Sequence, residues 1–224
     1  MNAVAGITEA LAINGYALLR EYRPSVSSIS AFEGLGIIDT VEGLSSIQQL
    51  TPKDMSDAPP NTYSGNFGTS GFPLHTDLAH WARPPRYLAL RCIHGSADVA
   101  TRLYDGRSLI AEFGVEALRM ALVQPRRPMR NGKQLLRLLE RADDSDTLRI
   151  RWDSLYLCSA APVTREIFNR ILDFLSQVKP IDIVLIHQGD TLIIDNWRVL
   201  HGRSPTALDA YSRHIDRTYM RSIA

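Results

Sequence analysis

Apolar residues in this chain occur mostly in short runs that are separated by residues typical of turns. Runs of about four to eight apolar, β-branched or aromatic residues between such turn signals predict β-strands. The predicted strands cover residues 16–19, 44–50, 86–93, 99–103, 135–139, 148–152, 181–186, 191–194 and 213–221. Because 181–186 and 191–194 flank the turn Gln188-Gly189-Asp190, we expect these two strands to form a hairpin.

Apolar residues at helical spacing are confined to fewer segments, which are 3–13, 27–35, 107–122 with a break at Gly114, and 164–178. The last segment is the clearest helix, since its apolar side chains form one stripe and Thr164 can cap its first turn. Many short strands with few helices predict a mainly β (α+β) fold. Such a fold is a β-barrel or β-sandwich with helices packed on its outside.

The size and composition of the chain fit one ordinary globular domain. Its 224 residues are 45% hydrophobic and 22% charged, with a formal net charge of +1. This balance argues against nucleic-acid and membrane-surface binding, which favour a basic excess. Cys92 and Cys158 are too few for a disulfide framework, so we expect free thiols in a reducing cytoplasm. The N-terminus lacks a signal-peptide pattern, and no apolar run approaches the roughly 20 residues of a membrane-spanning helix.

A stretch with little periodicity lies between Thr51 and Phe72 and is rich in Pro, Gly, Asn, Ser and Asp. Connections of this length are often active-site loops, although a solvated surface loop fits the composition equally well. Its position just before the motif described next favours an active-site loop. Tyr63 and Asn66 lie within it and are candidates for hydrogen bonds to a substrate.

The first chemical signal is the segment Leu74-His75-Thr76-Asp77. Side chains two residues apart in an extended segment point to the same side, so His75 and Asp77 can bind one metal ion. His201 is the candidate third ligand, because it follows an apolar strand and Gly202 lets the chain turn away. Two histidines and one carboxylate leave open positions on the metal, which is the facial-triad arrangement of iron(II) oxygenases.

Two arginines follow the third candidate ligand on the last predicted strand. A guanidinium suits a carboxylate and stays charged when buried, so Arg213 is the candidate for binding a 2-oxo acid cosubstrate. Arg217 shares the face of Arg213 and needs a second anion, either an anionic group of the substrate or a protein carboxylate. Asp195, Asn196 and Arg198 precede His201 and are expected to brace the turn that orients it.

Together these motifs resemble those of the taurine dioxygenase and clavaminate synthase-like oxygenases. The resemblance extends from about Tyr63 to the C-terminus and rests on Leu74-His75-Thr76-Asp77, on the run from Gly189 to Arg203, and on Ser212-Arg213-His214. The second of these blocks is especially similar to γ-butyrobetaine hydroxylase. The chain lacks the four-cysteine zinc module of that enzyme, so its specific activity is not implied.

The resemblance implies a double-stranded β-helix (jelly-roll) barrel in which His75, Asp77 and His201 bind iron. It implies that Arg213 and Thr101 bind 2-oxoglutarate. In taurine dioxygenase-like members an arginine at the position of Arg217 binds an anionic group of the substrate. A single oxygenase domain over 1–224 follows, in which 1–50 packs on the barrel, 51–74 forms the active-site loop and 75–224 forms the barrel core.

The expected activity uses Fe(II), 2-oxoglutarate and O2 to hydroxylate an unactivated C–H bond of a small amino acid or related acid, releasing CO2 and succinate. Desaturation, cyclisation or epoxidation with the same cofactors is one alternative. A non-catalytic barrel that binds a metal or a small acid is another, and a zinc hydrolase is a third. The sequence names neither the substrate nor the oligomeric state.

Overall fold

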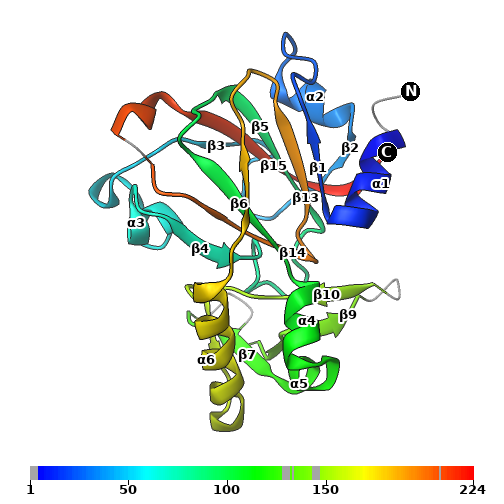
Figure 1. Cartoon of the computed structure of the whole chain (residues 1–224), viewed down its shortest axis with the longest axis vertical. Coiled ribbons are helices and arrows are strands. Elements are labelled where there is room, and N and C mark those ends of the chain that lie inside the picture. The colour runs from blue at the N-terminus through cyan, green and yellow to red at the C-terminus, as the bar shows by residue number, and fades with distance from the viewer. Residues whose placement is uncertain (1–4, 128–131, 133, 143–146, 207) are drawn as a thin grey trace.

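Two antiparallel sheets form the upper part of the molecule, and a smaller unit of helices and short strands lies beyond one end of them (Figure 1). The computed structural model describes residues 5–127, 132, 134–142, 147–206 and 208–224. The fold is mainly β with flanking helices, which confirms the predicted class. The start of the first predicted helix, at residues 3 and 4, lies outside the described residues.

The strand order of the two sheets places the first and last parts of the chain side by side. The six-stranded sheet has the order β1 (Tyr16–Leu19), β13 (Thr191–Asp195), β5 (Tyr87–His94), β15 (His214–Ile223) and β2 (Gly36–Ile38), with β3 (Gln48–Leu50) also paired to β15. The four-stranded sheet has the order β12 (Ile181–Val184), β6 (Ala100–Asp105), β14 (Val199–Arg203) and β4 (Phe72–His75). From β3 to β15 the strands of these two sheets alternate between them, except that β6 and β12 are neighbours.

Alternating side chains on the central strands are buried in two different hydrophobic clusters. Leu88 of β5 lies in the cluster between the sheets, together with Leu103 of β6. Ala89 points the other way, into a cluster that α1 (Ala5–Asn14) and α2 (Ser28–Glu33) cover. Both faces of β5 are therefore buried, which fixes its register because a slip of one residue would exchange the two faces.

The segment between β6 and β12 forms the smaller unit. Its elements are α4 (Arg107–Phe113), α5 (Val115–Met120), β7 (Leu122–Pro125), β8 (Leu136–Arg137), β9 (Leu139–Arg141), β10 (Leu148–Ile150), β11 (Leu157–Ser159) and α6 (Pro162–Gln177). Gly114 separates α4 from α5 at φ +80°, a conformation that glycine adopts without strain, and this confirms the predicted break. Trp152 packs on Phe168 of α6 at 4.8 Å between ring centroids, in a core of its own.

The predicted hairpin between residues 181–186 and 191–194 is wrong. β12 pairs with β6, whereas β13 pairs with β1 and β5, so the turn carries the chain from one sheet to the other. A local turn signal cannot distinguish these cases, because pairing depends on strands far away in the sequence. The carboxylate of Asp190 accepts hydrogen bonds from the N–H groups of Ile186 and His187 and from Arg20, which stabilises the crossing.

Helix boundaries and the loop also need correction. α6 begins at Pro162, and the Thr164 hydroxyl donates to the carbonyl of Leu122 at 3.1 Å instead of capping the helix. The segment predicted as a loop contains two short helices, η1 (Met55–Asp57) and α3 (Tyr63–Phe67). A further helical turn, η2 (Leu208–Ser212), precedes β15.

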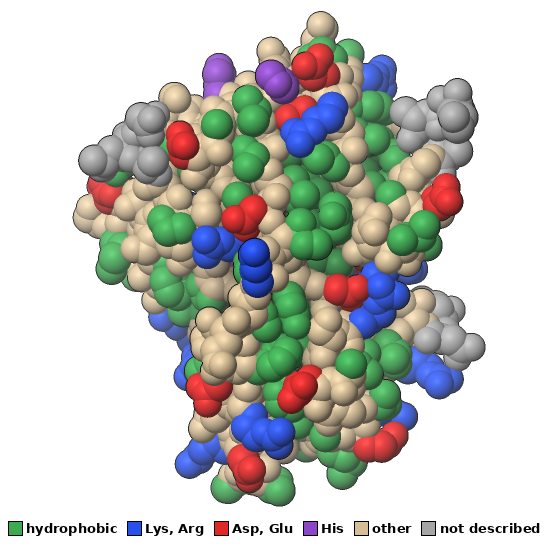
Figure 2. Space-filling view, in the orientation of Figure 1, with side chains coloured by type: hydrophobic (Ala, Val, Ile, Leu, Met, Phe, Trp, Pro, Cys, Tyr) green, Lys and Arg blue, Asp and Glu red, His purple; other side chains and the backbone are tan. Residues whose placement is uncertain are grey.

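The surface and the cysteines carry few functional signals. On the face shown in Figure 2, basic and acidic side chains of the described residues are interspersed. Cys92 is buried, Cys158 is partly buried, and both are free thiols. Among the described helices, none has both the length and the apolar character needed to cross a membrane.

Candidate metal centre and active-site cavity

Two neighbouring strands bring the three predicted ligands together. His75 ends β4 and stands directly opposite His201 of β14 in the sheet register. Asp77 follows His75 by two residues, and its side chain joins the same side. All three side chains are buried, with 5% of His75, 6% of Asp77 and 7% of His201 exposed.

The donor atoms of the three side chains converge. Nε2 of His75 lies 3.3 Å from Oδ1 of Asp77, and Nε2 of His201 lies 3.4 Å from the same oxygen. Ligands that bind one ion at about 2.1 Å and at right angles are roughly 3 Å apart. The three side chains therefore fit one divalent ion, and two imidazoles with one carboxylate are the donor set of non-haem iron(II). Among the described His, Cys, Asp and Glu residues, His75, Asp77 and His201 are the ones whose ligand atoms lie close enough together to hold one metal ion.

Backbone contacts orient two of the ligands. Nδ1 of His75 donates to the carbonyl of Pro73 at 2.9 Å, so Nε2 presents its lone pair to the metal position. The side chain of Asn196 accepts from the N–H of Asp77 at 2.7 Å and donates to its carbonyl at 3.0 Å. Asn196 lies in the turn that leads to His201, and it thus fixes the backbone of Asp77. Burial and the neighbouring His75 lower the pKa of His201, which favours the neutral imidazole that binds metals.

The second carboxylate oxygen of Asp77 is held by the last strand. Nη1 of Arg217 donates to Oδ2 of Asp77 at 3.0 Å, and the hydroxyl of Tyr219 donates to the same oxygen at 2.9 Å. Burial opposes the charge on Asp77, but Arg217 and His201 outweigh it and hold its pKa well below the usual range. Oδ1 therefore remains for the metal. Tyr219 was not predicted, although its place two residues after Arg217 puts both side chains on one face of the strand.

Arg217 is therefore engaged with protein partners. Besides Asp77, it donates from Nε and Nη2 to the side-chain oxygen of Gln48 on β3. The sequence predicted that Arg217 needs either an anionic group of the substrate or a protein carboxylate. The structure supplies a protein carboxylate, which is Asp77. Each terminal nitrogen keeps a second hydrogen, and Arg217 also lines the cavity described next.

A cavity of about 480 Å³ opens beside the three ligands. The predicted cosubstrate residues Thr101 and Arg213 both line it and are buried. Nε of Arg213 has no hydrogen-bond partner among the described residues, so this guanidinium can still bind an anion. Burial lowers the pKa of Arg213 to about 10, which leaves it charged at neutral pH. Arg203 lines the same region and packs over the Phe72 ring at 3.7 Å, a contact that the sequence did not predict.

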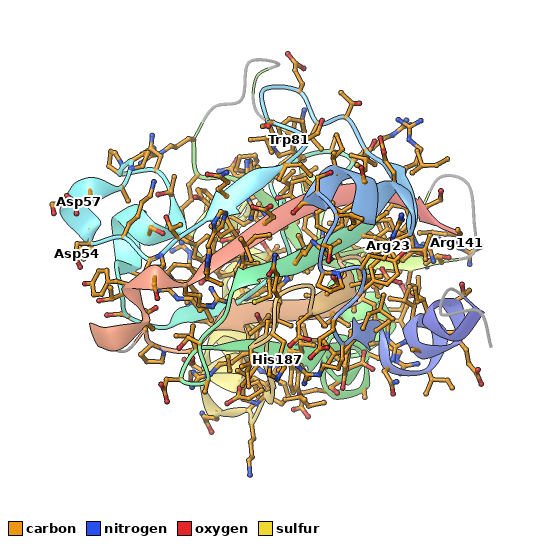
Figure 3. All side chains as sticks on the ribbon, turned by 90° about the horizontal axis from the view of Figure 1, so that it is seen from above. Arg23, Asp54, Asp57, Trp81, Arg141 and His187 are labelled. Atoms are coloured by element: carbon orange, nitrogen blue, oxygen red, sulfur yellow. The ribbon has the colours of Figure 1, made fainter. Side chains whose placement is uncertain are left out.

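Residues of the segment 51–74 line part of the cavity. Tyr63 of α3 lines the cavity and stacks on the His75 ring at 4.1 Å between centroids. The prediction for Asn66 needs correction, because its side chain is exposed and donates to the carbonyls of Pro60 and Thr62 within the segment itself. Asp54 and Asp57 lie at the outer edge of this segment, away from the sheets (Figure 3).

Asp153 and Tyr156 line another wall of the cavity, and neither was predicted because neither belongs to a recognisable spacing motif. His80, which closely follows the segment of His75 and Asp77, lines the cavity with them. The carbonyl of Trp152 accepts from the N–H of Thr76 at 2.8 Å, which ties this wall to the residue between two of the ligands.

The fold and this site define a mainly β protein in which two histidines and one aspartate, all buried, could hold one metal ion. The model of the taurine catabolism dioxygenase TauD, TfdA family matches residues 3–219, and the chain belongs to this family. It is thus a non-haem iron oxygenase that uses Fe(II), 2-oxoglutarate and O2. No curated protein sequence matches the chain.

Several solved structures that share this fold are described as oxygenases. Asparagine oxygenase in complex with Fe(II), 2S,3S-3-hydroxyasparagine and succinate is 17% identical, with a TM-score of 0.70 over 97% of this chain and 77% of its own. PvcB, described as an Fe, alpha-ketoglutarate dependent oxygenase from an isonitrile synthetic pathway, is 17% identical, with a TM-score of 0.67 over 98% and 83%. PvcB from Pseudomonas aeruginosa is 15% identical, with a TM-score of 0.67 over 99% and 84%. The non-heme iron oxygenase OrfP, with Fe, succinate and (3S)-hydroxy-L-Arg, is 19% identical, with a TM-score of 0.64 over 96% and 78%.

Proposed function

We propose that the protein hydroxylates an unactivated C–H bond of a small amino acid or related acid. One oxygen atom of O2 enters the product and the other enters succinate, which forms with CO2 from 2-oxoglutarate. The observation that carries this proposal is the convergence of His75, Asp77 and His201 at a cavity that Arg213 also lines, and Nε of this arginine has no hydrogen-bond partner among the described residues. Structures of similar fold bear hydroxylated asparagine and arginine together with succinate, which supports the substrate class.

Iron bound by these three residues would supply O2 activation coupled to the oxidative decarboxylation of 2-oxoglutarate. The protein supplies orientation, charge and exclusion of water. Arg217 and Tyr219 hold Oδ2 of Asp77, so that Oδ1 faces the metal. Tyr63 covers one face of His75 and limits the access of water from that side.

Arg213 and Thr101 are proposed to bind the distal carboxylate of 2-oxoglutarate. A buried guanidinium with an N–H that lacks a partner needs an anion, and a carboxylate accepts its planar fork of donors. The hydroxyl of Thr101 can donate to the same carboxylate. For Arg217 we propose two roles, the orientation of Asp77 and, through its remaining hydrogens, contact with an anionic group of the substrate.

We also propose that the two sheets form a double-stranded β-helix and that the chain is one oxygenase domain. The alternation of strands between two antiparallel sheets supports the first proposal, because jelly rolls are built this way. The family match over residues 3–219 supports the second. Residues 1–50 would then pack on the barrel, 51–74 would cover the active site, and 75–224 would form the barrel core with its inserted unit.

Oxygen-dependent release of succinate tests this function. The protein with Fe(II) and 2-oxoglutarate is expected to release succinate in air, faster when a substrate is present, and not under argon. His201→Ala should abolish this release, whereas Asp173→Asn on the exposed side of α6 should leave it unchanged. Tight iron binding without succinate release would favour a non-catalytic barrel that binds a metal or small acid. Turnover of a substrate under argon would favour hydrolysis at a metal.

The mass of the organic product separates hydroxylation from desaturation and cyclisation, and the loss of a substrate double bond identifies epoxidation. Hydroxylation adds one oxygen atom to the substrate, whereas desaturation and cyclisation remove two hydrogen atoms. Epoxidation adds one oxygen atom to an existing double bond. The same iron and 2-oxoglutarate residues serve all of these reactions, so only the product distinguishes them.

A further inference from the structure

A buried carboxylate lines the cavity without any role in the mechanism above. Asp153 is 1% exposed, and among the described residues no Lys or Arg side chain forms an ion pair with it. The backbone of the preceding residue, Trp152, is bonded to Thr76, which lies between the ligands His75 and Asp77. Asp153 therefore stands at a fixed place beside the metal centre.

The turn that follows Asp153 uses only part of its carboxylate. Oδ1 accepts from the N–H groups of Leu155 at 2.8 Å and Tyr156 at 2.9 Å. Within the described part of the chain, no hydrogen bond of ordinary geometry ends on Oδ2. The buried hydroxyl of Tyr63 lies close enough to the Asp153 carboxylate to shift its pKa, but no hydrogen bond of ordinary geometry joins these two described side chains. A structural role in the turn thus accounts for one oxygen and leaves the other for a ligand.

The surroundings of Asp153 favour a positively charged ligand. The rings of Tyr63 and Tyr156 meet edge to face at 5.7 Å, and His80 lies 5.0 Å from Tyr156, all on the lining of the cavity. Burial, with Arg151 adding to it, lowers the pKa of His80 to about 4, so its ring is neutral at pH 7 and does not repel a cation. Aromatic rings beside a carboxylate attract ammonium and guanidinium groups.

The energetics also favour a cation. A carboxylate taken out of water is costly unless a charge or strong hydrogen bonds compensate it, and burial raises the pKa of Asp153 although His75, two backbone N–H groups and Tyr63 oppose this shift. We propose that Asp153 binds a protonated amino or amidino group of the substrate, with Tyr63 and Tyr156 beside it. This inference rests on the proposed function and narrows its substrate class to amines, including zwitterionic amino acids.

Matched pairs of probes test the inference on the iron-loaded protein with 2-oxoglutarate. The probes are L-asparagine, L-arginine, L-ornithine and L-lysine, each compared with derivatives in which an amino group is acetylated. We expect at least one amine to bind roughly 10- to 100-fold more tightly than its acetylated form, which is the range of a hydrogen bond to a charged group. Binding is read from the change in the visible iron–2-oxoglutarate band and from the stimulation of succinate release.

Two Asp→Asn variants assign the preference to one residue. Asp153→Asn keeps an oxygen for the N–H groups of the turn but removes the charge, so the preference should fall to within about threefold. Asp173→Asn, the same change at an exposed site of α6, should retain the full preference.

Three outcomes are decisive against the inference. It fails if no amine binds better than its acetylated form while the visible band is present, and the proposed function then stands alone. It also fails if Asp153→Asn weakens iron binding but keeps the preference, because Asp153 then acts on the metal centre through His75. If the wild type shows neither the band nor succinate, the proposed function fails and the inference falls with it.

Discussion

The hydroxyl of Tyr219 offers a sharp test of how the iron carboxylate is held. Tyr219→Phe removes one oxygen atom, which donates to Oδ2 of Asp77 at 2.9 Å, and leaves the ring in the core between the sheets. Arg217 keeps its own bond to Oδ2 at 3.0 Å, so Asp77 stays charged but loses half of its support. We expect the protein to fold normally and to bind iron more weakly.

The size of the effect follows from the bond that is lost. A hydrogen bond to a charged group contributes about 1.5–3 kcal/mol. Because Arg217 remains, the lower end applies, which corresponds to roughly tenfold weaker binding of Fe(II). Partners of metal ligands typically change affinity by about 10- to 100-fold. Competition with a coloured chelator under argon measures the dissociation constant directly.

A matched control separates this effect from the loss of any tyrosine hydroxyl. Tyr211 is exposed and donates to Asp54 at 3.0 Å, so Tyr211→Phe removes the same kind of bond far from the iron site. It should leave the dissociation constant of Fe(II) unchanged. Equal affinities in wild type and Tyr219→Phe would refute the reasoning, and so would equal weakening in both variants.

Three further predictions follow from the site and the fold. Arg213→Met should raise the KM for 2-oxoglutarate by about 100-fold with little change in iron affinity, because it removes the counter-charge of a buried carboxylate; unchanged KM values would contradict this. Asn196→Ala should weaken iron binding about tenfold, measured by chelator competition, because it frees the backbone of Asp77. Asp190→Ala should lower the free energy of unfolding by about 3 kcal/mol at pH 7 in urea titrations, because it removes the bonds to the crossing turn. Although burial opposes its charge, backbone N–H groups and Arg20 lower the pKa of Asp190, so this contribution is complete above about pH 4 and disappears as the pH falls through the folded-state value. A difference between wild type and variant that persists at low pH would refute the assignment to the charged carboxylate.

Much of the fold was predictable because local patterns decided it. The strand at residues 16–19 and the helix break at Gly114 were predicted as they occur, since a short apolar run and a glycine at positive φ are local properties. The pairing of strands was not predictable in the same way. The turn at residues 188–190 has the signature of a hairpin, yet its strands belong to different sheets because β6 and β5 are their partners.

The residues of the site likewise fall into those that local sequence places and those that only tertiary packing places. His75 and Asp77 share one local segment, so period-2 alternation alone places them together, and His201 joins them through the register of β14 with β4. Asp153 carries no such signal. It reaches the cavity because the inserted unit between β6 and β12 folds back against Thr76, which is a matter of tertiary packing. Asn66 fails for the opposite reason, since its own loop satisfies its side chain.

The visible spectrum of the protein under argon, with Fe(II) and 2-oxoglutarate, shows whether 2-oxoglutarate binds the iron in this cavity. We expect a weak metal-to-ligand charge-transfer band in the wild type. The band should be absent in His75→Ala, should require higher 2-oxoglutarate in Arg213→Met, and should decay as succinate appears when O2 is admitted. Tight iron binding without a band in the wild type would contradict the assignment of 2-oxoglutarate to this cavity.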